Sequence, residues 1–150
     1  PIVLRAGWMM GGGPGKDKKF VSKILNQIKD GATELNVVDD KLGTPTYTYD
    51  FANNTKAIIE NEVWGLYNLV CQGITGRFEV AEKILSILGL DKKINLNKVS
   101  SQHFQDIYFA PRPPSERLIK KKLQLRGLDI MRDWEICLEE YLKKSYINFL

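Results

Sequence analysis

The segment most suggestive of chemistry is the glycine-rich run Gly11-Gly12-Gly13-Pro14-Gly15-Lys16. A glycine-rich turn that ends in Gly-Lys is typical of loops that hold phosphate through backbone N–H groups. A P-loop also needs a glycine where Met10 stands and Ser or Thr where Asp17 stands, while a dinucleotide-binding turn needs a third glycine where Lys16 stands. Both patterns fail, so a flexible surface loop is the better interpretation, since loops carry glycine freely.

Neither the histidine nor the cysteines form a recognisable chemical site. His103 is the only histidine, and although it can share a helix face with Asp106, a metal site needs further ligands. Cys71 and Cys137 lie within apolar, periodic segments, where a buried free thiol is more common than a disulfide or a ligand. The sequence also has no Gly-x-Ser-x-Gly elbow. We therefore predict no metal site, and spacing alone reveals no catalytic constellation.

The charge pattern gives no sign of a nucleic-acid or membrane partner. The net charge of +4 comes from 22 basic and 18 acidic side chains, a mild excess that is compatible with an anionic ligand. The basic run Lys120-Lys121-Lys122 spreads around a helix instead of forming one face, which favours a solvated surface. No stretch reaches the roughly 20 apolar residues of a membrane span, and the first residues do not resemble a signal peptide. We expect a cytoplasmic protein.

Strands and helices alternate along most of the chain, which predicts an α/β fold. The apolar run Ile2-Val3-Leu4 is typical of a strand buried on both faces of a parallel sheet, and ligands in α/β folds bind beyond the ends of such strands. Asp50 and Ser115 stand where they would cap two helices. Further strands are expected at residues 35–38 and 65–70, a turn at residues 39–45, and helices at residues 20–28, 50–59, 75–88, 115–125 and 134–142.

The length of the chain sets its domain organisation. A sequence of 150 residues with 43% hydrophobic residues can bury one sizeable core, so residues 1–150 are expected to form a single domain. The sequence opens with Pro1 and runs directly into the first strand. We therefore expect it to be part of a longer protein.

Five segments are similar to motifs of a known enzyme family. Residues 39–52 read Asp-Asp-Lys-Leu-Gly-Thr-Pro-Thr-Tyr-Thr-Tyr-Asp-Phe-Ala. This resembles the Asp-Gln-x-Gly-x-Pro-Thr stretch, followed by Asp-Leu-Ala, of dTDP-4-dehydrorhamnose reductases, with Lys41 in place of glutamine. The other four, in the family's order, are residues 4–11 (its Arg-Thr-Ser-Trp-Val strand end), 65–69 (its Gly-(Ile/Val)-Tyr-His-Leu strand), 110–113 (its Arg-Pro motif) and the closing helix with Trp134.

The resemblance implies an extended short-chain dehydrogenase. In this family an N-terminal Rossmann sheet binds NADPH or NADH, and a smaller, largely helical region closes over a nucleotide sugar. The chain corresponds to the last strands of the Rossmann sheet together with that substrate-binding region. The family's catalytic Tyr-x-x-x-Lys pair would precede Pro1, and none of the six tyrosines has a lysine four residues later. We therefore expect no catalytic residue here and no activity from the chain alone.

The resemblance also implies which residues contact the ligands. Trp8 matches the family tryptophan that contacts the substrate sugar, and Met9 and Met10 would lie beside the nicotinamide. Thr46 and Arg112 are predicted to make polar contacts, since arginine binds a diphosphate through paired hydrogen bonds. Core packing for Trp8 and a structural ion pair for Arg112 remain alternatives. Family members often form homodimers that hold a divalent ion between subunits, but no residue here identifies such a site.

Two other functions remain open from the sequence. The same fold can serve as a non-catalytic regulatory or scaffolding subunit, because fold does not fix function; an intact Tyr-x-x-x-Lys pair before Pro1 would favour a reductase. A free-standing sugar-nucleotide-binding module is the third reading, although an exposed strand edge at residues 2–4 argues against it. Lys41 and Asn68 depart from the family pattern, so the substrate is dTDP-4-dehydro-L-rhamnose or a related dTDP-deoxysugar.

Overall fold

The computed structural model describes residues 1–107 and 110–150. Its strands are β1 (Ile2–Ala6), β2 (Trp8–Met10), β3 (Glu34–Val38), β4 (Leu42–Gly43), β5 (Pro45–Tyr47), β6 (Gly65–Leu69), β7 (Thr75–Gly76) and β8 (Asn95–Val99). Its helices are α1 (Phe20–Lys29), α2 (Thr48–Glu60), α3 (Arg77–Leu88), α4 (Lys121–Leu125) and α5 (Trp134–Ser145), and a 3-10 turn covers Ser101–Phe104. The predicted α/β class is confirmed.

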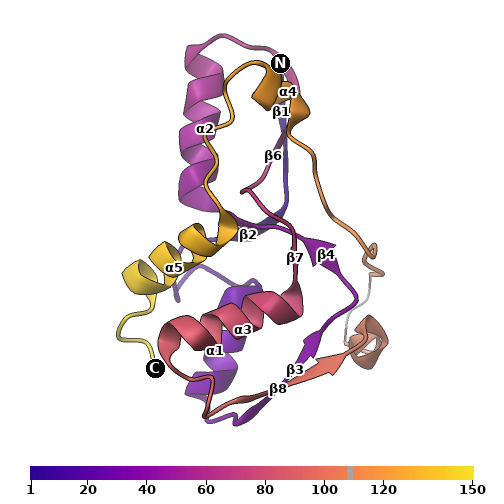
Figure 1. The fold of residues 1–150 in the computed structure, drawn as a ribbon, viewed down its shortest axis with the longest axis vertical. Helices are drawn as coiled ribbons and strands as arrows, with labels where there is room; N and C mark the ends of the chain where they lie inside the picture. Colours follow the sequence, from indigo (N-terminus) through magenta and orange to yellow (C-terminus); the bar gives the residue numbers. More distant parts are fainter. Residues whose placement is uncertain (108–109) are drawn as a thin grey trace.

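The strands pair two by two within the described ranges. β1 pairs with β6, β2 with β5 and β3 with β8, all parallel, while β4 and β7 are antiparallel. Figure 1 shows α2, α4 and the β1–β6 pair at one end of the molecule and α1, α3 and the β3–β8 pair at the other. α5 and β2 lie between these two ends, so β2 occupies the middle of the structure.

The first strand forms where the apolar run predicts it, but it is not buried on both faces. In β1, Ile2 and Leu4 are half-buried, whereas the side chain of Val3 is 48% exposed. Its partner β6 alternates in the same way, with Tyr67 and Leu69 buried and Leu66 41% exposed. Successive strand residues point to opposite faces. One face of this pair therefore covers the core, and the other stays open in the chain.

Both predicted helix caps are wrong. α2 begins at Thr48, and the carboxylate of Asp50 accepts hydrogen bonds from Arg132 instead of from the helix N–H groups. Ser115 lies before the short helix α4, which begins only at Lys121, and its hydroxyl accepts from the Arg117 side chain. The oxygen of Asp50 thus binds a cation that is distant in sequence, and the oxygen of Ser115 binds a side chain two residues away.

One lysine of the basic run is buried, contrary to the solvated face that its sequence suggests. Lys120 is 5% exposed and forms an ion pair with Asp129 at 2.8 Å, in which both side chains are buried. Lys122 lies 4.4 Å from the ring centroid of Tyr67 and donates to the carbonyl of Leu66. Lys120 is therefore buried in an ion pair, whereas Lys121 and Lys122 are exposed, as expected of a solvated face.

The glycine-rich loop is anchored to the last helix. The N–H of Gly13 donates to the hydroxyl of Tyr141 at 3.2 Å, and that hydroxyl donates to Asp17 Oδ2 at 2.8 Å. Gly12 and Gly13 adopt φ values of 92° and 68°, which favour glycine because a Cβ would be strained there. The loop that follows β2 is therefore held by a buried hydrogen-bond network.

Candidate functional site

The pairing of β2 with β5 brings the predicted site residues together. In the parallel register Trp8 lies opposite Pro45 and Met9 opposite Thr46. The Asp, Gly and Pro of residues 39–45 predict a turn, but the chain there forms the short strand β4 and the start of β5, separated by Thr44. Thr44 accepts from the N–H of Trp8 through its carbonyl, at 3.3 Å. The Pro-Thr motif is thus a strand that positions β2.

Trp8 is held by its edge and by one face. Its Nε1–H donates to Glu116 Oε2 at 2.6 Å. Gly43 lies directly against the ring: a Cβ at that position would be 2.5 Å from Cε2 and 2.9 Å from Cδ2 of the indole. Similar distances to both atoms place the glycine over the ring face and not at its rim. Gly43 therefore covers one face of the indole, which is partly exposed elsewhere.

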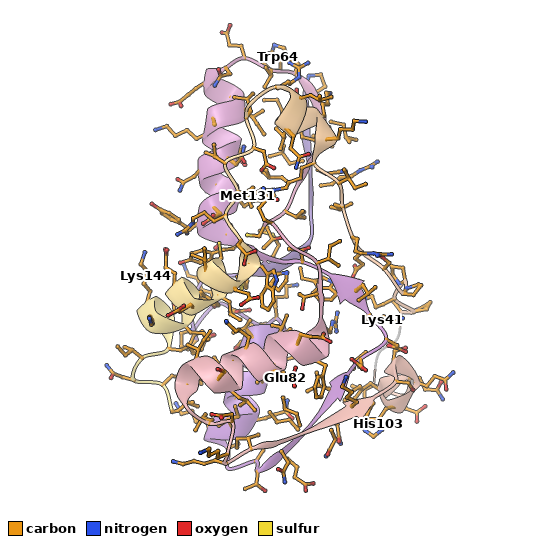
Figure 2. All side chains as sticks on the ribbon, viewed as in Figure 1. Lys41, Trp64, Glu82, His103, Met131 and Lys144 are labelled. Atoms are coloured by element: carbon orange, nitrogen blue, oxygen red, sulfur yellow. The ribbon has the colours of Figure 1, made fainter. Side chains whose placement is uncertain are left out.

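The other two tryptophans do not offer such a surface. Trp64 is 65% exposed and lies at the tip of the molecule beyond α2 (Figure 2). Trp134 is 7% exposed and belongs to the hydrophobic core. Only Trp8 combines partial exposure with an adjacent carboxylate and an adjacent guanidinium. This combination of an apolar face and fixed polar groups is typical of small-molecule sites.

Arg77 is the guanidinium beside Trp8. It is the first residue of α3, and its Cζ lies 5.2 Å from the ring centroid of Trp8 and 5.9 Å from that of Phe20. These distances are typical of cation–π contacts. Within residues 1–107 and 110–150, Arg77 forms no ion pair with a carboxylate. Its N–H donors are therefore available to a ligand.

The structure separates the predicted site residues into accessible and buried ones. Trp8 and Met9 are partly exposed and Arg112 is exposed. Thr46 is fully buried, and its hydroxyl donates to the carbonyl of Thr44 at 3.2 Å. Met10 is 2% exposed and packs in the core. In this conformation the side chains of Thr46 and Met10 do not reach the surface, so they support the strands that carry their neighbours.

Arg112 lies on a segment that runs past β4 to Trp8. Leu42 donates to the carbonyl of Pro114 at 3.0 Å and accepts from the N–H of Glu116 at 2.8 Å. Lys41 Nζ donates to the carbonyl of Arg112 at 2.8 Å; Figure 2 shows Lys41 on the same side of the molecule as β4. Arg112 and Glu116 are four residues apart, a span of at most about 14 Å. The segment thus places Arg112 within a ligand's length of Trp8.

A second cluster of chemically capable groups is buried where α2, β6 and α5 meet. The donor atoms of Asp50, Cys71 and Cys137 all lie within 4.8 Å of one another, and the two sulfurs are 3.7 Å apart. Hydrogen bonding to Cys137 lowers the pKa of the Cys71 thiol, whereas the same contact and burial raise the pKa of Cys137. The cysteines are buried free thiols, as predicted.

This cluster is a poor site for a metal cation because a guanidinium already binds its carboxylate. Arg132 donates to both carboxylate oxygens of Asp50, with the shortest contact at 2.6 Å. Burial by itself would raise the pKa of Asp50, but the hydrogen bonds and charge of Arg132 outweigh it and hold that pKa below its usual value. A metal ion would have to displace or repel the guanidinium. The cluster therefore serves the fold.

Two shallow hollows lie away from Trp8. One, of about 250 Å³, is bordered by α3 and α5, and the other, of about 380 Å³, lies along α5. Both are lined mainly by Glu and Lys side chains, whereas ligand pockets are mostly apolar with a few fixed polar groups. Neither includes any of the predicted site residues. The surroundings of Trp8 remain the best candidate site.

Three residues of this site were not identified from the sequence. Gly43 was noted only as part of the Gly-x-Pro-Thr stretch, and its need for a bare Cα follows from the indole above it. Arg77 and Glu116 were assigned no role, because neither forms a motif with Trp8. Both reach it from distant segments, at the start of α3 and after the Arg-Pro motif, so spacing carries no signal for them.

Comparison with known proteins links this geometry to a family. Residues 1–147 match the family model described as the RmlD substrate binding domain. The dTDP-4-dehydrorhamnose reductase of Mycobacterium tuberculosis is 32% identical over 137 residues, which cover 91% of this chain and 43% of that protein. The chain thus spans less than half the length of this relative.

Solved structures of similar proteins have the same fold. The dTDP-4-dehydrorhamnose reductase of Yersinia enterocolitica superimposes with a TM-score of 0.84 and 33% identity, over 96% of this chain and 49% of that one. The corresponding enzyme from Bacillus anthracis, solved in complex with NADP, gives a TM-score of 0.85 and 28% identity, over 96% and 48%. In both cases the chain matches about half of the solved protein.

Proposed function

Because the chain belongs to the RmlD substrate binding domain family, we propose that it is the substrate-binding part of an NAD(P)H-dependent nucleotide-sugar reductase. The substrate would be dTDP-4-dehydro-L-rhamnose or a related dTDP-deoxysugar. The observation that carries this proposal is the Trp8 site: a partly exposed indole fixed by Glu116 and Gly43, with a guanidinium over its ring. An aromatic face bordered by fixed polar groups suits a deoxyhexose, which is apolar on one side and carries hydroxyls at its rim.

The accessible residues have distinct roles in this proposal. Trp8 forms a wall against the sugar ring. Arg112, which is exposed and has no carboxylate partner within the described part of the chain, binds the diphosphate through paired charge-assisted hydrogen bonds. Thr46 acts indirectly, because its buried hydroxyl bonds to Thr44, whose carbonyl accepts from the N–H of Trp8. It therefore fixes the strand that carries the wall.

The residues at the end of β2 fit a nicotinamide only in part. Met9 is partly exposed and adjoins Trp8, so a ring bound beside the sugar can contact its thioether. Met10 is buried in the core and supports Met9 from behind. When bound, the cofactor supplies hydride to the sugar ketone. The chain's own contribution is to orient the sugar and to exclude water from it, and the acid that protonates the ketone oxygen comes from outside this sequence.

Isothermal titration of the chain with dTDP-rhamnose tests this function, alongside a Trp8→Ala variant and a matched Trp64→Ala control. We expect the wild-type chain and the control to bind equally, because Trp64 lies at the far tip of the molecule. The Trp8→Ala variant is expected to lose binding while it keeps the wild-type circular dichroism spectrum. A folded wild-type chain that does not bind, or a Trp8→Ala variant that binds as well as wild type, would contradict the proposal.

A further inference from the structure

Two oppositely charged side chains flank Trp8 without pairing with each other. Glu116 lies at the indole N–H, and the guanidinium of Arg77 lies 5.2 Å from the ring centroid. Each is partly buried. No ion pair joins them in the part of the chain that the structure describes, although both adjoin the same ring. Because they do not pair with each other, both groups keep hydrogen-bonding capacity for a ligand at the partly exposed ring.

That capacity can be counted. A carboxylate accepts about four hydrogen bonds and a guanidinium donates five. Glu116 uses Oε2 for the indole N–H, and its Oε1 has no hydrogen bond within residues 1–107 and 110–150. The guanidinium of Arg77 lies over the rings of Trp8 and Phe20 and forms no hydrogen bond within those residues. The site therefore offers a free acceptor and several free donors around one apolar surface.

Charge decides which part of a nucleotide sugar these groups face. The carboxylate of Glu116, 2.6 Å from the indole nitrogen, offsets the guanidinium of Arg77, so the surroundings of Trp8 carry no net charge that would attract a diphosphate. Sugar hydroxyls, in contrast, both donate and accept, so they satisfy Glu116 and Arg77 at the same time. The diphosphate is better served by Arg112, which lies four residues before Glu116 and has no carboxylate beside it among the described residues.

On the basis of the proposed function, we infer that Arg77 and Glu116 are specificity-determining residues that read the hydroxyl groups of the sugar held on Trp8. Glu116 accepts from one hydroxyl while it fixes the indole, and Arg77 donates to another oxygen of the same ring. A site that hydrogen-bonds a substrate hydroxyl rejects analogues that lack it, because its own buried polar groups are then left unpaired. The pair therefore selects a hydroxylated sugar over the nucleotide alone.

The test compares two ligands, dTDP-rhamnose and dTDP, in wild type and in two variants. Glu116→Gln keeps an oxygen that can accept from Trp8 but removes the charge, and Arg77→Met keeps an apolar chain over the rings. We expect each variant to lose about tenfold or more in affinity for dTDP-rhamnose and to bind dTDP as wild type does, because a hydrogen bond to a charged group is lost only with the sugar.

Matched controls are available at exposed positions. Arg126→Met, after the end of α4, and Glu60→Gln, at the end of α2, make the same chemical changes far from Trp8. Neither should alter the affinity for either ligand. The emission spectrum of the tryptophans checks that the Trp8 environment survives in Glu116→Gln.

The outcomes separate the inference from the proposed function. Arg77→Met or Glu116→Gln variants that keep the full preference for dTDP-rhamnose over dTDP overturn the inference while the proposed function stands. Arg77→Met that weakens both ligands equally means that Arg77 contacts the diphosphate, which also overturns it. A wild-type chain that binds neither ligand overturns the proposed function, and the inference with it.

Discussion

The Asp50 cluster and the Trp8 site contain the same kinds of groups in opposite states. Asp50 accepts from the backbone and guanidinium of Arg132, and that guanidinium also donates to Glu140 at 2.7 Å. At Trp8, the guanidinium of Arg77 has no carboxylate partner within the described ranges. Groups whose hydrogen bonds are already complete hold the fold together, whereas groups with unused donors and acceptors are available to a ligand. The comparison predicts that mutations in the first region change stability and those in the second change binding.

The largest expected effect is on stability, from Arg132→Met. The substitution leaves the Asp50 carboxylate, whose side chain is 3% exposed, without its guanidinium. Breaking a buried pair by removing one partner costs about 3 kcal/mol, toward the low end of the usual range because Arg132 is itself partly exposed. Urea unfolding measures the loss. The matched control is Lys143→Met, which breaks an exposed i,i+4 pair with Glu139 and should cost less than about 1 kcal/mol. Equal losses of unfolding free energy in Arg132→Met and Lys143→Met would contradict a stabilising role for the buried pair.

The pair of Asp50 and Arg132 also predicts that the unfolding free energy of the wild-type chain falls at acid pH. Arg132 holds the pKa of Asp50 below the usual value of an aspartate carboxyl. A carboxyl whose folded pKa is depressed stabilises the fold above its unfolded pKa, and this contribution is lost as the pH falls through the folded value. We therefore expect the difference in unfolding free energy between wild type and Arg132→Met to shrink below about pH 4. A difference that is constant from pH 7 to pH 2 would contradict this assignment.

Tyr141→Phe tests whether a buried hydrogen-bond network that contains no cation also stabilises the fold. The hydroxyl of Tyr141 is buried between Gly13 N–H and Asp17, and burial raises its pKa well above the usual value. Removing it leaves two polar atoms, Gly13 N and Asp17 Oδ2, without this partner, at a cost of about 2 kcal/mol. The exposed Tyr49→Phe serves as control and should stay within about 0.5 kcal/mol of wild type in urea unfolding. Equal effects would mean that the network adds nothing.

The smallest stability effect is expected at the site itself, from Gly43→Ala. The new Cβ would lie 2.5 Å from the indole of Trp8, so the ring must move. Because Trp8 is partly exposed, the overpacking costs only about 1 kcal/mol. Affinity for dTDP-rhamnose should fall more clearly, and the tryptophan emission should shift. Gly15→Ala, where a Cβ meets nothing within 4 Å, is the control. Unchanged affinity in Gly43→Ala would contradict the placement of the ligand on Trp8.

Local patterns predicted much of the fold. β1, β6 and the helices α1 and α3 lie where apolar periodicity placed them, and Gly89 ends α3 in the left-handed conformation typical of such a terminus. The strands β2, β4, β5, β7 and β8 were missed, because each is short or polar and gains its stability from a partner distant in sequence. The cap predicted at Asp50 failed for the same reason: its carboxylate accepts from Arg132, which no window around Asp50 contains.

In the candidate site, too, residues in local motifs could be predicted and residues from distant segments could not. Trp8 and the Gly-x-Pro-Thr stretch were visible because the residues stand next to each other in motifs. Arg77 and Glu116 were not, since their proximity to Trp8 exists only after β4, β7 and the segment after the Arg-Pro motif have come together. Burial could not be read from the motifs either: Thr46 and Met10 stand beside accessible residues but point into the core.

The parallel pairing of distant strands also has a kinetic consequence. The strands β1 and β6, β2 and β5, and β3 and β8 are each joined by a long stretch of chain, and no two consecutive strands form a parallel pair. Such a topology has a high contact order, so loops must close before any pair is stabilised, and folding is slow. During synthesis, the apolar strand Ile2–Ala6 waits for Gly65–Leu69 to emerge from the ribosome. Until then its apolar side chains and unpaired edge stay exposed, which favours aggregation.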